Sequence, residues 1–248
     1  MKLTSYSRSA NACRANGGSN GGTTLRLSIS DTWLGLPENL VSELLGGKTS
    51  HHLKAGHTLF QTGDVGDGCY RLDKGMLKIC LTSSQGEERI LAVLASGSIV
   101  GDLAMIDALP RSASVVAVTD CELRFVSRSA FEDLVRQHPE IHRYLVEVLT
   151  ARLRQANETI AALAFLTVKG RVARALLELA ENLGEQIDSG AILLPPMFRQ
   201  RELAAMAGVA RENVSRILSD FERRRLVTKS GGSFQIDDKA KLQREIDW

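Results

Sequence analysis

Two charged side chains in one short segment are suited to binding the phosphate ester of a sugar. Asp102 follows Gly101, and Arg111 is followed by Ser112. A guanidinium can donate to two phosphate oxygens at once, and a serine hydroxyl adds a further donor. A glycine at the start of a helical turn lets backbone N–H groups approach an anion, while the carboxylate can accept from a sugar hydroxyl. The segment favours a nucleotide monophosphate; for Arg111 taken alone, a surface ion pair is the alternative.

A second group of residues, near the C-terminus, is suited to reading DNA. Arg211 and Arg216 lie in one predicted helix, and each could donate two hydrogen bonds to a guanine, while Glu212 could accept from a cytosine. Contacts to DNA phosphates, which position a protein without reading sequence, are predicted for Gln200, Arg201, Ser215 and Lys229. An amphipathic pair of helices with solvated arginines is the alternative.

The phosphate-binding candidates lie in a region that reads as short strands. Between His57 and Val126, brief apolar runs alternate with glycines, which is typical of antiparallel strands in a small sandwich or barrel. The turns at residues 73–75 and 85–87 each contain a glycine and suit hairpins. Before this region, residues 37–46 predict one short amphipathic helix.

A long helix is predicted between the two groups, from Pro139 to Leu163. Its apolar residues follow a heptad spacing, at Val146, Leu149, Leu153, Ala156, Ile160 and Leu163. Twenty-five helical residues span about 38 Å. A stripe this narrow favours a facing helix, and we expect the seam of a parallel homodimer; packing onto the strands is the alternative.

The C-terminal region reads as a winged helix-turn-helix. A helix is predicted over residues 171–183, ending at Gly184, followed by helices over residues 200–207 and 211–224 with Gly208 in the turn between them. A hairpin with Gly231 and Gly232 at its tip would form the wing, and Asp237 could cap a last helix.

Composition and charge agree with a DNA-binding protein of the cytoplasm. The chain has 248 residues, of which 44% are hydrophobic and 24% charged, as in ordinary globular proteins. Residues 199–248 hold 11 basic and 8 acidic side chains, which points to an anionic partner. No apolar run is long enough for a membrane span, and residues 1–30 read as a flexible tail without the apolar core of a secretory signal. The four scattered cysteines fit a reducing compartment.

The motifs together resemble one known family. Gly101-Asp102-Leu103-Ala104 with Pro110-Arg111-Ser112-Ala113 resembles the phosphate-binding cassette of cyclic-nucleotide-binding domains. Residues 163–173 resemble the hinge, and residues 211–218 the DNA-reading helix, of bacterial cyclic AMP receptor proteins. The resemblance is collinear over about residues 34–236. On this resemblance the chain is identified as a member of the CRP/FNR superfamily of transcription regulators, nearest to the cyclic AMP receptor branch.

The resemblance implies an α+β fold with four parts. They are a tail (1–30), a cyclic-nucleotide-binding jelly-roll β-barrel (31–137), a dimerisation helix with its hinge (138–166) and a winged helix-turn-helix (167–248). It implies cyclic AMP or a related cyclic nucleotide as effector, a homodimer, and an operator in double-stranded DNA with half-sites near TGTGA. The resemblance is also compatible with RNA polymerase as a further partner. Neither a membrane partner nor enzymatic activity is expected, since the motifs of common hydrolases and nucleotide-triphosphate enzymes are absent from the sequence.

The resemblance also assigns residues to the two sites. The implied nucleotide-binding residues are Gly101, Asp102, Leu103, Ala104, Arg111, Ser112, Ala113, Arg152 and Asn157, and the implied DNA-binding residues are Gln200, Arg201, Arg211, Glu212, Asn213, Ser215, Arg216 and Lys229. No metal site is expected, because the histidines and cysteines are scattered and the tail holds only Cys13 as a thiol ligand.

Two departures from the family pattern bear on the ligand. Asp102 stands where the family has Glu, and Ala156-Asn157 stand where the receptor reads adenine with a Thr-Ser pair. Ala156 has no group that can hydrogen-bond a base, whereas Asn157 has one. Two alternatives therefore stay open: a regulator that ignores nucleotides or binds cyclic GMP or cyclic di-GMP, and a nucleotide-binding module that controls a protein partner.

Overall fold

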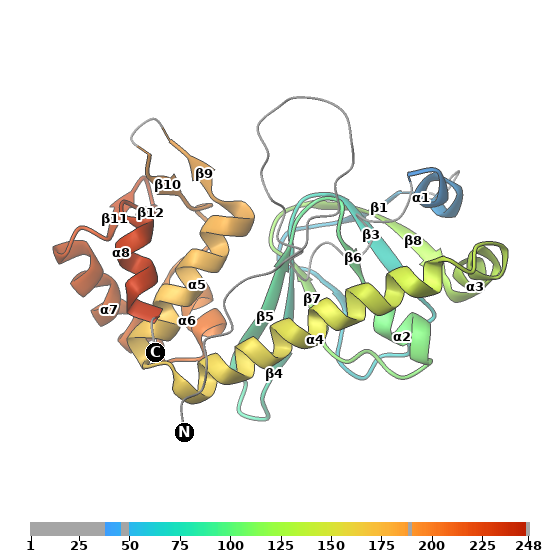
Figure 1. The fold of residues 1–248 in the computed structure, drawn as a ribbon, viewed down its shortest axis with the longest axis horizontal. Helices are drawn as coiled ribbons and strands as arrows, with labels where there is room; N and C mark the ends of the chain where they lie inside the picture. The colour runs from blue at the N-terminus through green and yellow to red at the C-terminus, as the bar shows by residue number, and fades with distance from the viewer. Residues whose placement is uncertain (1–37, 46–49, 188–189, 247–248) are drawn as a thin grey trace, which may run out of the picture.

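The computed structural model describes residues 38–45, 50–187 and 190–246. The predicted tail, residues 1–30, lies outside these ranges. A strand-rich N-terminal part and a mainly helical C-terminal part lie at opposite ends, and one long helix runs between them (Figure 1). None of the described helices is long and apolar enough to cross a membrane.

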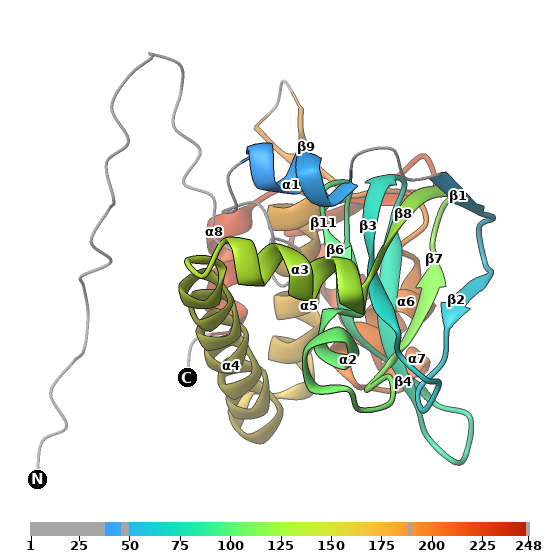
Figure 2. The ribbon, with the colours of Figure 1, turned by 90° about the vertical axis from the view of Figure 1, so that its right-hand side faces the viewer.

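Two four-stranded antiparallel sheets form the N-terminal part (Figure 2). The first has the order β1 (Ser50–Leu53), β8 (Cys121–Ser127), β3 (Gly68–Lys74) and β6 (Ile99–Val100). The second has the order β2 (Thr58–Phe60), β7 (Ser114–Ala117), β4 (Leu77–Thr82) and β5 (Glu88–Leu94). Their shared core contains Leu72, Leu77, Leu94, Val115 and Leu123. Because the strands divide into two sheets, the unit is a jelly-roll-like sandwich rather than a closed barrel.

The two predicted hairpin turns have different outcomes. Gly86 lies between β4 and β5, which pair with each other, so this hairpin is confirmed. Gly75 connects β3 to β4, which belong to different sheets, so the hairpin predicted there is wrong. At Gly75 φ is +100°, and a Cβ would lie 2.4 Å from the Asp120 carbonyl oxygen. The glycine thus allows a close passage between the sheets rather than a turn within one.

Short helices close one end of the sandwich. Helix α1 (Glu38–Leu45) matches the predicted amphipathic helix and buries Leu40, Leu44 and Leu45. These side chains share a core with Phe131 of α3 (Arg128–Gln137) and Ile141. Ser127 begins α3 by accepting a hydrogen bond from the backbone N–H of Ala130.

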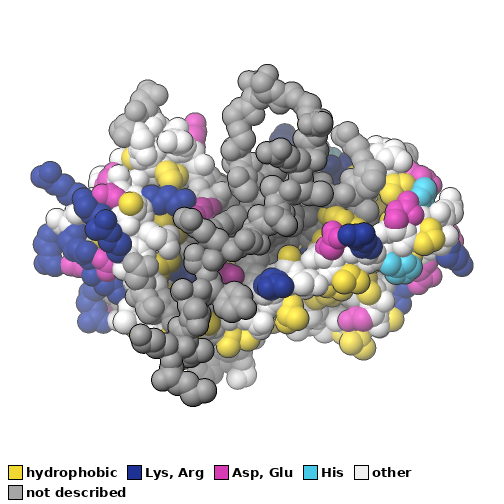
Figure 3. All heavy atoms as spheres, viewed as in Figure 1, with side chains coloured by type: hydrophobic (Ala, Val, Ile, Leu, Met, Phe, Trp, Pro, Cys, Tyr) yellow, Lys and Arg dark blue, Asp and Glu magenta, His cyan; other side chains and the backbone are white. Residues whose placement is uncertain are grey.

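The long helix α4 (Ile141–Phe165) exposes most of its apolar stripe. Leu153 is 63% and Ile160 is 64% exposed, and the only buried side chains of the helix are Ile141 and Ala162. Figure 3 shows hydrophobic side chains along this helix on the outer face. The alternative that the stripe packs onto the strands is therefore wrong, and a large apolar area is left for another partner.

The C-terminal part packs its helices around one core. Helix α5 (Val168–Leu183) begins three residues earlier than predicted, because the Thr167 hydroxyl accepts from the Gly170 N–H. Helices α6 (Gln200–Ala207) and α7 (Arg211–Arg223) match the predicted pair. Residues from all three helices share one core, which includes Leu176, Leu203, Val214, Leu218 and Phe221.

The predicted wing is a hairpin. Its strands are β11 (Val227–Ser230) and β12 (Ser233–Ile236), and the sheet continues through β10 (Ile192–Leu193) and β9 (Glu185–Gln186). The chain then forms α8 (Lys239–Gln243) and the 3-10 turn η1 (Arg244–Ile246). Asp238 caps α8 by accepting from the Lys241 N–H, so the prediction of Asp237 as the cap is wrong. The carboxylate of Asp237 instead accepts from Thr228.

Candidate nucleotide site and nucleic-acid interface

Arg111 lies in a close-fitting cradle beside the first turn of α2 (Asp102–Asp107). The residue is only 4% exposed, and its Nη1 donates to the Gly101 carbonyl oxygen at 2.7 Å. Its guanidinium carbon lies 4.3 Å from the centroid of the Phe60 ring. A Cβ on Gly101 would lie 2.4 Å from Nη1, and one on Gly66 would lie 3.3 Å from the guanidinium carbon. The two glycines thus make room for the arginine.

The backbone fixes Arg111 from the other side. Its N–H donates to the Asp64 carbonyl, and its own carbonyl accepts from the Gly63 N–H, each at 2.8 Å. The loop between β2 and β3 therefore holds the arginine against α2. Burial raises the pKa of the nearby Tyr70 phenol, and the positive charge of Arg111 opposes that shift.

The charges in this cluster leave one cation without a counter-ion. Asp102 is 4% exposed, and its Oδ2 lies 3.0 Å from Nη1 of Arg152 on α4. Arg111, by contrast, forms no ion pair among the residues that the structure describes, and its buried Nε–H has no hydrogen-bond partner there. A buried cation without an anion is costly, so the cluster is suited to a ligand with one negative charge.

The structure brings together only part of the predicted nucleotide set. Gly101, Asp102, Arg111 and Arg152 form the cluster, and Ala104 and Ala113 are buried beside it. The side chains of Leu103, Ser112 and Asn157 are exposed, as is Ala156.

Phe60 and Gly66 were missed by the sequence reading. Gly66 belongs to the glycine-containing stretch between His57 and Val126, and no motif marked Phe60, whose position near Arg111 depends on strand pairing.

The predicted reading helix presents its polar face to solvent. Arg211, Glu212 and Arg216 are exposed, while Val214 and Leu218 are buried on the opposite face. Arg216 donates a hydrogen bond of 2.5 Å to the side-chain oxygen of Asn213, which is also a predicted DNA-binding residue. The alternative of an amphipathic pair of helices with solvated arginines would present the same exposed face, so the choice between the two rests on the family comparison below. Figure 3 shows Lys and Arg side chains gathered at the end of the molecule formed by α7 and α8.

The residues predicted to contact DNA phosphates differ in their surroundings. Arg201 and Lys229 are exposed, and the Lys229 ammonium lies 3.1 Å from a carboxylate oxygen of Glu222. Gln200 and Ser215 are half-buried.

An arginine of the N-terminal sandwich meets the turn of the helix-turn-helix. Gly208 ends α6 with φ +62°, and a Cβ there would lie 2.1 Å from Nη1 of Arg89 on β5. Arg171 of α5 donates to the Gly208 carbonyl at 3.3 Å. Burial lowers the pKa of Arg89, and the charge of Arg171 lowers it further. This contact, which the sequence reading missed, joins the two parts of the molecule beside a cavity of about 100 Å³.

No group of three or more potential metal ligands occurs within the described ranges. Cys69, Cys80 and Cys121 are buried, and burial raises the pKa of both Cys80 and Cys121. Cys13 lies outside the described residues.

Comparison with known proteins assigns both parts. Residues 50–138 match the cyclic nucleotide-binding domain, and residues 170–245 match the Crp-like helix-turn-helix domain. A CRP-like cAMP-activated global transcriptional regulator of Mycobacterium tuberculosis is 35% identical over 189 residues, which cover 76% of this chain and 84% of the relative. The chain belongs to the CRP/FNR family. Its members are transcription regulators that bind DNA and function as dimers, and this chain is a cyclic-nucleotide-binding regulator rather than an enzyme.

Other CRP/FNR relatives give the same picture. The Cyclic AMP receptor protein of Thermus thermophilus is 35% identical over 191 residues, which cover 76% of this chain and 83% of the relative. A CRP/FNR transcriptional regulator of known structure from Thermus thermophilus has a TM-score of 0.66 at 26% identity, covering 80% of this chain and 98% of that one. The global regulator CLP of Xanthomonas campestris has a TM-score of 0.72 at 22% identity, covering 82% and 100%, and shows the shared fold.

Proposed function

We propose that this chain forms a homodimer whose affinity for a specific operator is controlled by cyclic AMP. The observation that carries the proposal is the buried guanidinium of Arg111, which has no acidic partner among the described residues. The cyclic phosphate of the nucleotide carries one negative charge and supplies that partner. Relatives that are 35% identical bear names that describe activation by cAMP, which supports the choice of nucleotide.

In the proposed complex each side chain of the cluster has one task. Arg111 holds the phosphate through N–H groups that Gly101 does not use, and Asp102 accepts from the ribose hydroxyl. Arg152 holds the Asp102 carboxylate in place, since their charged atoms lie 3.0 Å apart. Ser112 is proposed to contact the phosphate and Asn157 the base. Both side chains are exposed and therefore accessible to a ligand. Gly101, Leu103, Ala104 and Ala113 supply backbone donors and shape.

The exposed stripe of α4 supports the homodimer. Val146, Leu149, Leu153, Ile160 and Leu163 are all exposed and share the heptad spacing of a two-helix seam. We place the nucleotide domain at residues 31–137, the dimer helix and hinge at 138–166 and the DNA-binding domain at 167–248. The proposed location is the cytoplasm, and RNA polymerase is the proposed further partner at promoters.

The proposed switch acts through the dimer helices. Ligand binding next to Arg152 shifts α4, and the two reading helices then reach a separation of about one DNA turn, roughly 34 Å. The ligand can drive this change only by binding the DNA-competent state more tightly. Moving the population from 1:99 to 99:1 needs about 5.5 kcal/mol of differential binding.

A second candidate rests on the exposed Ala156, which cannot hydrogen-bond a base. It is a regulator that binds cyclic GMP or cyclic di-GMP, or that needs no nucleotide. The structurally similar regulator CLP of Xanthomonas campestris is described as responsive to c-di-GMP, so cyclic di-GMP is included among the ligands to be tested.

Isothermal calorimetry with the full chain tests the ligand directly. Cyclic AMP, cyclic GMP, cyclic di-GMP and 5′-AMP are titrated into the protein and into the variants Arg111→Met and Arg136→Gln. Arg136 is an exposed arginine paired with Asp133, so it controls for loss of one positive charge. We expect cyclic AMP to bind the parent and Arg136→Gln alike, with binding lost in Arg111→Met. Heat from cyclic di-GMP alone, or unchanged binding in Arg111→Met, would overturn the proposal.

A further inference from the structure

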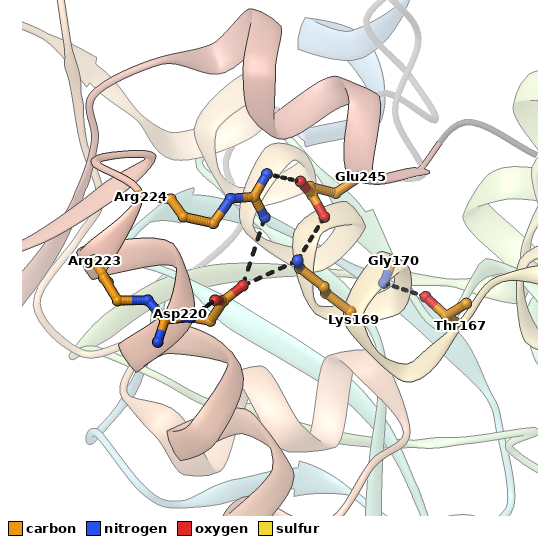
Figure 4. A network of polar contacts seen from close by, with 7 residues as sticks. All are labelled: Thr167, Lys169, Gly170, Asp220, Arg223, Arg224 and Glu245. Carbon is orange, nitrogen blue, oxygen red and sulfur yellow. Dashed lines mark hydrogen bonds and ion pairs between the residues drawn. The ribbon is translucent and has the colours of Figure 1, made fainter.

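Three segments that are far apart in the sequence meet in one closed set of ion pairs (Figure 4). Lys169 of α5 has its Nζ 3.0 Å from Asp220 Oδ2 of α7 and 3.0 Å from Glu245 Oε2 of η1. Arg224, which follows α7, has Nη2 2.5 Å from Glu245 Oε1 and Nη1 3.5 Å from Asp220 Oδ2. Each of the two acids therefore contacts both bases. We call Lys169, Asp220, Arg224 and Glu245 the C-terminal ring.

The C-terminal ring is more than a set of solvated surface charges. The side chain of Glu245 is only 14% exposed and that of Asp220 is 27% exposed. Lys169 Nζ also lies 5.6 Å from the centroid of the Phe221 ring, which belongs to the domain core. Partly buried charges are screened less by salt, and a network holds geometry better than an isolated pair.

The backbone packs closely at the same place. A Cβ on Gly170 would lie 3.0 Å from the carbonyl oxygen of Glu245, so η1 lies against the first turn of α5. The first turn of α5 is itself held by the hydrogen bond from the Gly170 N–H to the Thr167 hydroxyl. Only Leu166 and Thr167 separate α5 from the end of the dimer helix α4.

The C-terminal ring thus lies between the proposed source of movement and the DNA-reading surface. Lys169 is in the first turn after the α4–α5 link, and Asp220 and Arg224 are at the end of α7 opposite its exposed Arg211 and Glu212. Glu245 joins the two because it contacts Lys169 and Arg224 together. Without its charge, only Asp220 would connect this end of α7 to Lys169.

We propose that Glu245 is a positioning residue for DNA binding. It ties the recognition helix α7 to the first turn of α5, so that the angle set at the α4–α5 link fixes the separation of the two reading helices in the dimer. This inference rests on the proposed homodimer but does not depend on which nucleotide binds. Glu245 itself contacts no DNA in this account.

The test compares operators of different geometry, with Glu245→Gln in the full chain. Three duplex probes are measured by fluorescence anisotropy. The first has two TGTGA half-sites centred about one DNA turn apart, which we call the natural separation. The second has two base pairs inserted between the half-sites, and the third has a single half-site. Glu181→Gln is the matched control, because Glu181 pairs with Lys239 at 3.1 Å in the same domain without joining α5 to α7. Circular dichroism and thermal unfolding confirm that each variant is folded.

We expect the parent and Glu181→Gln to prefer the natural separation over the altered one. In Glu245→Gln that preference falls at least fivefold, while affinity for the single half-site changes less than twofold. Lys169→Gln gives the same result, and the double variant is no worse than either single one. A merely structural role would lower affinity for all three duplexes by the same factor, and that result, or a retained preference, overturns the proposal.

The same measurements with and without cyclic AMP separate this inference from the proposed function. If the parent prefers the natural separation but its affinity does not change with cyclic AMP, the proposed effector is contradicted. The positioning role of Glu245 is then still decided by the Glu245→Gln result.

Discussion

Arg152 Nη1 lies 3.0 Å from Asp102 Oδ2, and this ion pair joins the dimer helix α4 to the first turn of α2. Both side chains are largely buried, with 20% and 6% of their surface exposed. The carboxylate that we assign to the ribose hydroxyl is therefore held by a residue of the helix whose outer face is predicted to meet a second copy. In the proposed complex, this one pair of charges would link ligand contact at Asp102 to movement of α4.

Removing the arginine of this pair leaves a buried carboxylate without a partner. We expect Arg152→Met to lower the free energy of unfolding by about 3 kcal/mol, the lower end of the cost for breaking a buried pair, because Arg152 keeps some exposure. Urea denaturation measures this change. The double variant with Asp102→Asn should recover part of the loss, and the exposed Arg154→Met is the control. A loss below about 0.5 kcal/mol in Arg152→Met would show that the pair is solvated.

A side chain at Gly208 is predicted to fit only if the guanidinium of Arg89 moves away. A Cβ would meet Nη1 of Arg89 at 2.1 Å, and φ is +62°. Gly208→Ala should therefore cost more than the roughly 1–2 kcal/mol of the left-handed backbone alone. In Gly208→Ala combined with Arg89→Ala only the backbone cost should remain. Thermal unfolding of the four proteins decides, and strict additivity of the two substitutions would contradict the contact.

Leu153 tests the seam on α4, where it is 63% exposed in the single chain. Replacing it by Glu should not unfold the protein, because no core contact is lost. In a dimer the same change would place two carboxylates in an apolar seam, so we expect the sedimentation coefficient to fall to that of a monomer. The exposed Glu147, which pairs with Arg143, gives the control Glu147→Gln. A dimer that persists in Leu153→Glu would place the seam elsewhere.

The C-terminal ring makes stability depend on pH. The hydrogen bond from Arg224 lowers the pKa of Glu245, and the hydrogen bond from Lys169 lowers the pKa of Asp220. Because the folded pKa values lie below the unfolded ones, this stabilisation is present above about pH 4–5 and is lost as the pH falls through the folded values.

Lys169 is expected to make the free energy of unfolding fall at alkaline pH, which gives the stability curve an alkaline limb beside the acid limb. Burial acts to lower its pKa, but the hydrogen bonds to Asp220 and Glu245 raise it overall, so its contribution is lost as the pH rises above 10.5. Urea denaturation from pH 3 to pH 11 should show both limbs in the parent. In Glu245→Gln the acid limb should be shallower, and an unchanged acid limb would contradict the assignment of these shifts.

Much of this architecture could be predicted because it depends on local patterns. The heptad spacing in α4, the paired helices around Gly208 and the cassette at residues 101–113 are all readable within short windows. The stripe of α4 could be predicted to face another helix, rather than the strands, because its apolar face is narrower than a core-facing helix requires.

The errors and omissions concern relations between distant residues. The glycine turn at Gly75 has a hairpin composition, but composition does not say that its two strands belong to different sheets. Phe60 and Gly66 become part of the Arg111 cradle only after β2 pairs with β7 and the following loop folds over α2. The contacts of Arg89 with Gly208 and of Lys169 with Glu245 likewise join residues that no short sequence window contains.

The central claim is that a cyclic phosphate bound at Arg111 is sensed by the helices that hold DNA. The direct measurement is the affinity for a two-half-site operator, by fluorescence anisotropy, with and without saturating cyclic AMP, in the parent and in Arg111→Met. We predict that cyclic AMP raises the affinity of the parent at least tenfold and leaves that of Arg111→Met unchanged. Equal operator affinity of the parent with and without the nucleotide, or an equal gain in Arg111→Met, would contradict the claim.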